Sequence, residues 1–231
     1  MFAWIGACSR STPARELDLE LIHVAAENAR LRTDIVGSDK FEEISAFVLV
    51  DAENTSGEHA YVTLGGELTD AGGVALGTLK PQSLYVPAHQ SRTFALVDTE
   101  RKPRPSATSA RIIVRGALVS TDPPRARIED LHTYVDENRI VAQAYLVNDA
   151  DRLGQIIVIA SFHDAQDRPM KRPFQLLKIG PKRDGDPSPP EPGECFDVGS
   201  NDWPTSSKCA VMFVGPTGSK SGTIYLGDVV Y

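Results

Sequence analysis

Short apolar segments alternate with clusters of turn residues along most of this 231-residue chain. The segments that we interpret as strands in its first half cover residues 47–50, 61–64, 84–86, 92–97 and 111–115. Between them lie Asn, Asp, Gly, Pro and Ser, residue types that favour turns for distinct conformational reasons. Short strands separated by turns at intervals of about 8–12 residues are typical of a β-sandwich or barrel. The pattern therefore predicts an all-β fold.

The same pattern begins again after Pro123 and Pro124, which cannot continue a strand ladder. Two longer apolar segments follow, at residues 140–147 and 156–162. Near the N-terminus, leucines alternate with acidic residues, which predicts a half-buried strand over residues 16–21.

An internal repeat connects the two parts of the chain. Asn54 and Asn148 are 94 positions apart, and so are Asp70 and Asp164. The apolar positions between these pairs coincide without a gap: Val62, Leu64 and Leu68 correspond to Ile156, Val158 and Phe162. Recurrence of two turns and the strand between them in one register predicts an internal duplication. The alternative is that any two hairpins of similar length look alike.

This repeat and the break at the prolines divide the chain. We expect a flexible N-terminal segment at residues 1–15, a first β-sandwich at 16–120 and a second at 125–231. The second carries an insertion at 181–193 that is rich in Pro, Gly, Asp and Lys. Such a composition buries too little apolar area to offset the entropy cost of ordering, so we expect a mobile loop there.

Composition excludes some functions and leaves others open. The net charge of −7 and the pI of about 5.3 make general nucleic-acid binding unfavourable, since an acidic surface repels phosphates. No stretch approaches the about 20 apolar residues of a transmembrane helix.

The N-terminal residues contain a small-residue motif that ends in a cysteine. Residues 5–8, Ile-Gly-Ala-Cys, are similar to a bacterial lipobox, which predicts lipidation of Cys8. The apolar run before Cys8 is shorter than the usual signal core and lacks a basic region. If Cys8 carries lipid, Cys195 and Cys209 remain as one pair, and a disulfide between them would contribute about 3 kcal/mol. The alternative is a chance match and three unpaired thiols in a cytoplasmic protein.

Motifs that carry catalysis or bind metals do not emerge from the sequence. The segment 215–221 is similar to a phosphate-binding loop, but Ser219 stands where that loop needs Gly before Lys220, so we predict a hairpin turn. The five histidines lack the spacings that place two imidazoles on one metal ion. We therefore predict no catalytic residues, no metal site and no cofactor, and we expect that the protein is not an enzyme.

One aromatic residue stands out in a polar loop of the second repeat. Trp203 follows Asn201 and Asp202, and it either caps the core or offers a stacking face to sugar or protein. These three residues are the candidate binding surface.

Each repeat resembles the FxLYD modules of bacterial envelope proteins, which are similar in shape to immunoglobulin-like sandwiches. The resemblance is carried by an apolar strand ending in Asn54 or Asn148, then an alternating strand that closes in a turn at Asp70 or Asp164. Neither repeat shows the namesake motif. The resemblance implies two tandem immunoglobulin-like β-sandwiches in an envelope lipoprotein, and it supplies no catalytic residues.

Together these features predict a noncatalytic cell-envelope protein that acts as an interaction or structural module. We expect an envelope protein as its partner, and contact with the membrane only through a lipid at Cys8. The alternative function is a carbohydrate- or small-ligand-binding module around Trp203. The alternative locations are secreted and cytoplasmic.

Overall fold

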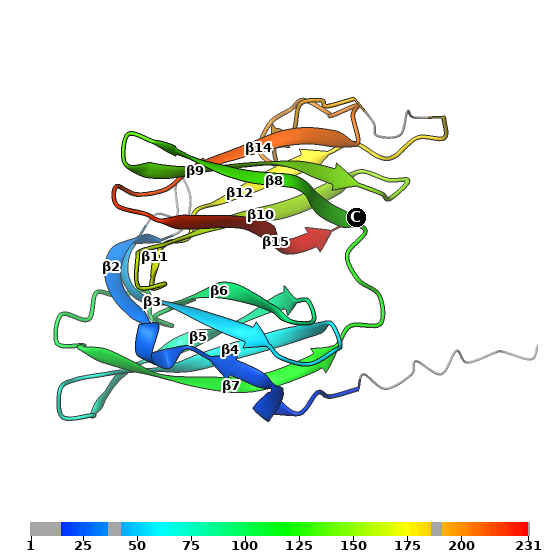
Figure 1. Ribbon diagram of the computed structural model, residues 1–231. Coiled ribbons are helices and arrows are strands. Elements are labelled where there is room, and N and C mark those ends of the chain that lie inside the picture. Colours follow the sequence, from blue (N-terminus) through cyan, green and yellow to red (C-terminus); the bar gives the residue numbers. More distant parts are fainter. Residues whose placement is uncertain (1–14, 37–42, 186–190, 231) are drawn as a thin grey trace, which may run out of the picture.

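A computed structural model describes residues 15–36, 43–185 and 191–230, and these residues form an all-β protein. The only helical segments among them are two short 3-10 turns, η1 (Leu19–Leu21) and η2 (Ala26–Asn28). We call residues 15–119 the N-terminal half and residues 126–230 the C-terminal half. Figure 1 shows them one above the other, the N-terminal half in blue to green and the C-terminal half in green to red.

The N-terminal half contains two antiparallel sheets. Its strands are β1 (Ile22–Val24), β2 (Arg30–Val36), β3 (Glu43–Asn54), β4 (Ala60–Thr69), β5 (Ala75–Val86), β6 (Gln90–Val97) and β7 (Ser109–Val119). In one sheet, β3 pairs with β1 and β2 along one edge and with β6 along the other. In the other sheet, β4 lies between β5 and β7.

The C-terminal half has the same strand order. Its strands are β8 (Ala126–Asp136), β9 (Arg139–Asn148), β10 (Gly154–His163), β11 (Pro169–Lys171), β12 (Phe174–Ile179), β13 (Phe196–Asp197), β14 (Lys208–Val214) and β15 (Ser221–Val230). Here β9 lies between β8 and β14, as β3 does between its neighbours. In the second sheet β10 pairs with β11 and β12 on one side and with β15 on the other, and β13 extends that sheet beyond β12.

In each half the two sheets enclose a hydrophobic cluster, which is a sandwich-like arrangement. Alternate residues of a strand point to opposite faces of its sheet, so every second side chain faces the partner sheet. Val62, Leu64 and Leu68 of β4 are fully buried, and so are their counterparts Ile156, Val158 and Phe162 of β10.

Two buried asparagines make the same hydrogen bonds at the same spacing. Asn54 Nδ2 donates to the carbonyls of Glu58 and Val86, and its Oδ1 accepts from the Ser56 amide. Asn148 Nδ2 donates to the carbonyls of Arg152 and Gly180, and its Oδ1 accepts from the Ala150 amide, with every partner 94 positions further along. Each side chain thus joins backbone groups of two segments, of which the Val86 and Gly180 carbonyls accept buried hydrogen bonds.

Two aspartates repeat a turn in the same register. Asp70 Oδ1 accepts from the amides of Gly72 and Val74, while Asp164 Oδ1 accepts from those of Gln166 and Arg168. Such side-chain bonds to following amides favour a tight turn. In the C-terminal half the turn also carries an ion pair, because Arg168 Nη2 lies 2.9 Å from the Asp164 carboxylate.

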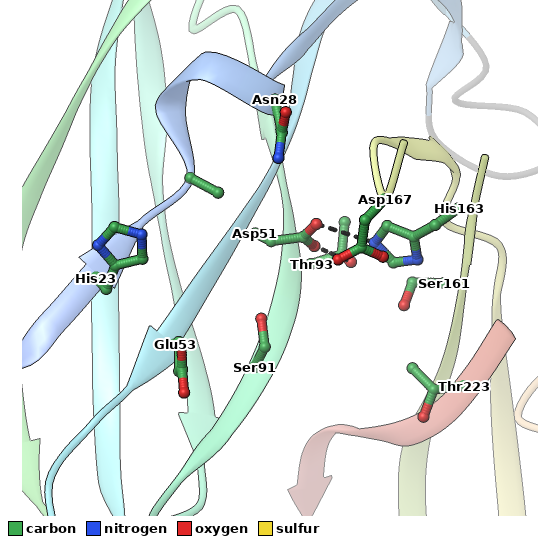
Figure 2. Close-up of a pocket in the computed structure, with 11 residues that line it drawn as sticks. His23, Asn28, Asp51, Glu53, Ser91, Thr93, Ser161, His163, Asp167 and Thr223 are labelled. Atoms are coloured by element: carbon green, nitrogen blue, oxygen red, sulfur yellow. Dashed lines mark hydrogen bonds and ion pairs between the residues drawn. The ribbon is translucent and has the colours of Figure 1, made fainter. Parts of the chain in front are cut away.

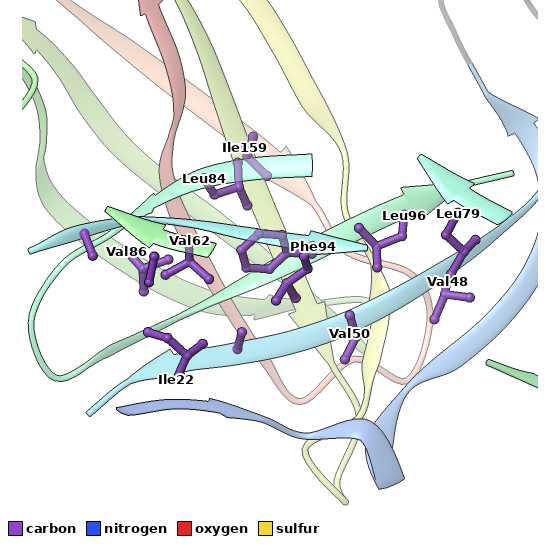
Figure 3. Packing of buried hydrophobic residues seen from close by; sticks show 14 of the residues in the cluster. Ile22, Val48, Val50, Val62, Leu79, Leu84, Val86, Phe94, Leu96 and Ile159 are labelled. Atoms are coloured by element: carbon purple, nitrogen blue, oxygen red, sulfur yellow. The ribbon is translucent and has the colours of Figure 1, made fainter. Parts of the chain in front are cut away.

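The N-terminal core is completed by residues of the C-terminal half. Ile159 of β10 and Tyr225 of β15 are each 2% exposed and belong to the cluster formed by the N-terminal sheets. Figure 3 shows Ile159 next to Leu84 in that cluster. The Tyr225 hydroxyl donates to the Thr93 carbonyl at 2.7 Å. Ile159 and Tyr225 lie on the outer face of the sheet that contains β10 and β15. This face therefore covers the side of the N-terminal half between β5 and β6.

Polar contacts connect the halves beside this apolar junction. Arg30 of β2 forms an ion pair with Asp164, and Arg32 Nη1 donates to the Met170 carbonyl at 2.6 Å. The carboxyl pKa of Asp164 is lowered to about 2: burial raises it, but hydrogen bonds from Arg168 and from the Gln166 amide, with the Arg168 charge, lower it further. The Asp164 turn is therefore both a local structure and a contact between the halves.

The strand predicted over residues 16–21 is wrong. Only Glu16 forms a β-bridge, to Leu118, and residues 19–21 form η1, because the Asp18 carboxylate accepts from the Glu20 amide and starts a helical turn. Leu17 is buried, while Leu19 and Leu21 are exposed. The alternating leucines and acidic residues at positions 16–21 thus belong to a turn, in which only Leu17 of the three leucines is buried.

Candidate functional site

The sequence-predicted surface lies in the loop between β13 and β14. Trp203 is 68% exposed, so it does not cap the core. The ammonium of Lys178 on β12 lies 4.8 Å from the centre of its ring and donates to the carbonyls of Ser200 (2.6 Å) and Asp202 (2.7 Å). Lys178 itself is only 4% exposed. The loop therefore covers Lys178 and holds the indole ring in a defined place on the surface.

The two polar neighbours of Trp203 differ in their contacts. The Asp202 carboxylate accepts from the Ser200 hydroxyl at 3.3 Å, and the Asp202 amide donates back to that hydroxyl at 3.0 Å. Asp202 therefore stabilises the loop, while Asn201 is exposed beside it. The structure places all three predicted residues together, on the outside of the C-terminal half.

Two further apolar side chains extend this surface along β12. Phe174 and Leu176 are 48% and 42% exposed, and they share the outer face of the sheet with Lys178 because they are separated from it by even numbers of residues. We call Phe174, Leu176 and Trp203 the apolar strip. It runs from the loop above Lys178 toward the junction of the halves.

At the junction the strip meets a groove of about 450 Å³ between the two halves. Phe174, Ile157 and Ile159 line it from the C-terminal half, and Tyr61 and Leu84 from the N-terminal half. The phenol pKa of Tyr61 is raised by burial and by the nearby charges of Asp228 and Asp122. Tyr61 is thus partly withdrawn from water in a wall that also carries negative charge.

A second hollow, which we call the polar cleft, lies on the other side of the Ile159 and Tyr225 junction. It encloses about 270 Å³. Figure 2 shows its two walls facing each other, one from each half. The N-terminal wall carries His23, Asn28, Asp51, Glu53, Ser91 and Thr93, and the C-terminal wall carries Ser161, His163, Asp167 and Thr223.

One ion pair spans the polar cleft. His163 Nε2 donates to Asp51 Oδ2 at 2.9 Å, and the Thr93 hydroxyl donates to the other carboxylate oxygen of Asp51. Burial lowers the pKa of the His163 imidazole, but the hydrogen bond and charge of Asp51, with the charges of Asp167 and Asp164, raise it to a net value above the ordinary 6.5. The pair favours the protonated imidazole and joins β10 to β3.

The cleft brings a serine, a histidine and an aspartate together, the residue types of a hydrolytic triad. A triad needs the histidine hydrogen-bonded to the serine so that it can take its proton. In the part of the chain that the structure describes, no hydrogen bond joins Ser161 to His163. The hydrogen bond of His163 to Asp51 instead ties the imidazole to the opposite wall of the cleft.

The arrangement of potential ligand side chains bears on metal binding. Within residues 15–36, 43–185 and 191–230, no group of three or more His, Cys, Asp or Glu side chains is arranged to hold a metal ion. The same residues contain no helix with the length and hydropathy needed to cross a bilayer.

The cysteines take different positions. Cys195 and Cys209 form a disulfide, as the sequence predicts, with their Cα atoms 5.6 Å apart. It joins the segment after the insertion to β14, and Gly193 forms a bridge beside it. Cys8 and all but the last residue of the flexible segment predicted at residues 1–15 lie outside the described residues. Residues 186–190 of the insertion also lie outside them.

Sequence reasoning missed both hollows. Their walls come from strands far apart in the chain, and β10 shows why the signal was weak. The outer face of β10 carries Ile157, Ile159, Ser161 and His163. Along this face, Ile157 lines the groove, Ile159 lies at the junction of the halves, and Ser161 and His163 line the polar cleft. In sequence this strand reads as an almost uninterrupted apolar run. The change from isoleucine to serine and histidine was the only available sign.

Comparisons with models of protein families, with curated protein sequences and with solved structures found no match.

Proposed function

We propose that this chain is a noncatalytic cell-envelope protein that binds a partner protein through the apolar strip. The observation that carries the proposal is the strip itself, in which exposed Phe174 and Leu176 on one face of β12 adjoin the exposed Trp203 of the neighbouring loop. Exposed aromatic residues held in place are typical of binding surfaces, since little side-chain entropy is lost on contact. The insertion at residues 181–193, for which the sequence predicts a mobile loop, belongs to the same half. The Cys195–Cys209 disulfide attaches the segment that follows this insertion to β14.

The proposal includes two tandem immunoglobulin-like β-sandwiches that arose by duplication. Support comes from the shared strand order and from the matching hydrogen bonds of Asn54 and Asn148. The FxLYD-like relationship is part of this proposal and rests on the residues quoted from the sequence. The envelope location rests on Cys8 as a lipid anchor and on the disulfide, which an oxidising compartment favours.

Site-specific photo-crosslinking in the native envelope tests the proposed surface. A benzophenone amino acid at Leu176 should give a crosslink to one discrete partner, and the same probe at Ile113 should not. Ile113 is a matched control because it is also an exposed apolar strand residue, 44% exposed, but on β7 of the other half. Equal crosslinks from both positions, or none from Leu176, would contradict the proposal.

The location has its own test. Replacing Cys8 with Ser should move the protein from the membrane fraction to the soluble fraction of the envelope, because one lipid-bearing thiol is lost. An unchanged distribution would remove the lipid anchor at Cys8 from the proposal.

A carbohydrate-binding module is the second candidate. Only one face of the Trp203 ring is covered by Lys178, and its high exposure leaves a stacking face free. Retention of the protein on a glycan array that disappears in Trp203→Ala would favour sugar over protein as the ligand.

The polar cleft makes a third possibility testable. If Ser161 were a nucleophile, a fluorophosphonate probe would label it, and His163→Ala would abolish the labelling. We expect no labelling, because His163 is hydrogen-bonded to Asp51 and not to Ser161.

A further inference from the structure

The polar cleft contains a buried hydroxyl without a partner. Ser161 is 1% exposed and no hydrogen bond of its Oγ occurs among the described residues; the oxygen is not among the fully enclosed unpaired atoms, so its small exposure faces the cleft. Buried polar side chains are nearly always paired, so such a group marks a place where something else binds. Figure 2 shows the Ser161 oxygen directed into the space between the two walls, above Thr223. Thr223 is its cross-strand neighbour on β15 and lines the same cleft.

Each wall of the cleft also carries a carboxylate that is outside any ion pair, although the charge of Asp167 acts on His163. Glu53 lies on the N-terminal wall, between His23 and Ser91 in adjacent strands, and Asp167 lies on the C-terminal wall. Neither side chain forms an ion pair with another described residue. Asp51 differs, because its charge is paired with His163.

The charge of the cleft follows from these residues. Asp51 is already hydrogen-bonded to His163, so the carboxylates of Glu53 and Asp167 leave the cleft with negative charge. No Lys or Arg is among the residues that line it. A low-dielectric hollow between two walls concentrates such a field and favours a cation over a neutral molecule.

The size and the remaining groups restrict the ligand further. About 270 Å³ accommodates a small molecule of sugar size and excludes a peptide segment. The hydroxyls of Ser91, Ser161 and Thr223 can each donate and accept hydrogen bonds. This set matches a compound that carries hydroxyl groups as well as positive charge.

We propose that the polar cleft is a binding site for a small ammonium compound bearing hydroxyl groups, of which an amino sugar is the simplest example. The carboxylates of Glu53 and Asp167 attract the ammonium, and Ser161 and Thr223 bind the hydroxyl groups of the compound. The site exists only while the two halves are packed together, because each half supplies one wall. This site is separate from the apolar strip and does not depend on the partner-protein proposal.

Titration of the full chain with glucosamine, followed by amide chemical shifts in NMR, tests the proposal. Glucosamine should shift amides around Ser161, Thr223 and Glu53 in a saturable way. N-acetylglucosamine is the matched probe, because it keeps the ring and removes the ammonium charge, and it should bind at least tenfold more weakly.

Two variants and two controls locate the site. Glu53→Gln should weaken glucosamine binding about tenfold, because one charge-assisted hydrogen bond is lost. Ser161→Ala should weaken binding several-fold without lowering the thermal midpoint, since its hydroxyl has no partner to lose. The matched control for it is Ser207→Ala, another buried hydroxyl without a partner among the described residues, which lies outside the cleft. Glu20→Gln is the exposed-charge control.

The outcomes separate cleanly. Glucosamine binding that both cleft variants weaken and both controls retain supports the proposal. No saturable shift, equal binding of N-acetylglucosamine, shifts confined to another surface, or shifts caused by Ca²⁺ but not by glucosamine would each overturn it.

Discussion

The two halves of this protein share a strand order and differ in how their cores are closed. Among the described residues, the C-terminal core contains only residues of its own half, and a disulfide joins two of its segments. The N-terminal core includes Ile159 and Tyr225 of the other half. Repetition of a scaffold therefore does not imply two independent units. Here the outer face of the sheet that contains β10 and β15 contributes to the N-terminal core, and the two hollows flank the resulting junction.

The largest expected effect comes from removing the junction residue. Ile159→Ala should lower the free energy of unfolding by about 3 kcal/mol, through lost burial and a cavity. Urea unfolding measures the loss, and amide exchange should show faster opening at Leu84 and Phe94 in the N-terminal half. Ile157→Ala, on the same face but only partly buried, is the control and should cost about 1 kcal/mol. Faster exchange confined to the C-terminal half would show that the N-terminal core closes without Ile159.

The disulfide should act on the C-terminal half. Replacing Cys195 and Cys209 together with Ala should cost about 3 kcal/mol on the chain-entropy estimate. Thiol titration of the unfolded, unreduced protein should find both sulfurs blocked in the parent chain. Reactive thiols at both positions would contradict the bond.

The repeated asparagines should have matching effects. Asn54→Ala and Asn148→Ala should each cost about 2–3 kcal/mol, since each removes two hydrogen bonds to backbone carbonyls, one of them buried, and one from a backbone amide. Urea midpoints provide the comparison, and the exposed Asn201→Ala should change stability by less than about 0.5 kcal/mol. A difference above about 1.5 kcal/mol between the two asparagines would show that equal contacts have unequal weight in the two halves.

The smallest effect concerns pH. The pKa of His163 is raised in the folded protein, so its pairing with Asp51 stabilises the junction fully below 6.5. This contribution is lost as the pH rises through the raised folded value. The groups that face His163 are Asp51 and Thr93 from the N-terminal half and Asp164 and Asp167 from its own turn.

As the pH rises from below 6.5 through the raised pKa of His163, the free energy of unfolding should therefore fall slightly more in the parent protein than in His163→Gln. The difference should be about 1 kcal/mol or less. Equal slopes in the two proteins would mean that the pair does not couple the halves.

Local features of this fold could be predicted from sequence because they have local causes. Turn residues and alternation identified the long strands, and the spacing of Asn54 and Asn148 identified positions that make the same contacts. The strand expected at residues 16–21 failed because one aspartate, Asp18, can start a helical turn within an alternating pattern. Trp203 was recognised as a surface residue of interest, but the choice between cap and exposed face needed the position of Lys178.

The hollows could not be predicted, for a different reason. They depend on how two sheet faces meet, and that relation is set by a few side chains such as Ile159 and Tyr225. Periodicity reports which face of a strand is apolar, not which neighbour covers it. Phe174 and Ser161 lie on one outer face, yet one borders water and the other lines a cleft.

The position of Tyr225 has a consequence for synthesis. During translation the strands β1 to β7 emerge first, but the core between them stays open until β10 and then β15 leave the ribosome. Until then the N-terminal half exposes the apolar side that Ile159 and Tyr225 later cover. A chaperone that protects nascent apolar surface would therefore be needed early, and the arrival of β15 would end that dependence for both halves at once.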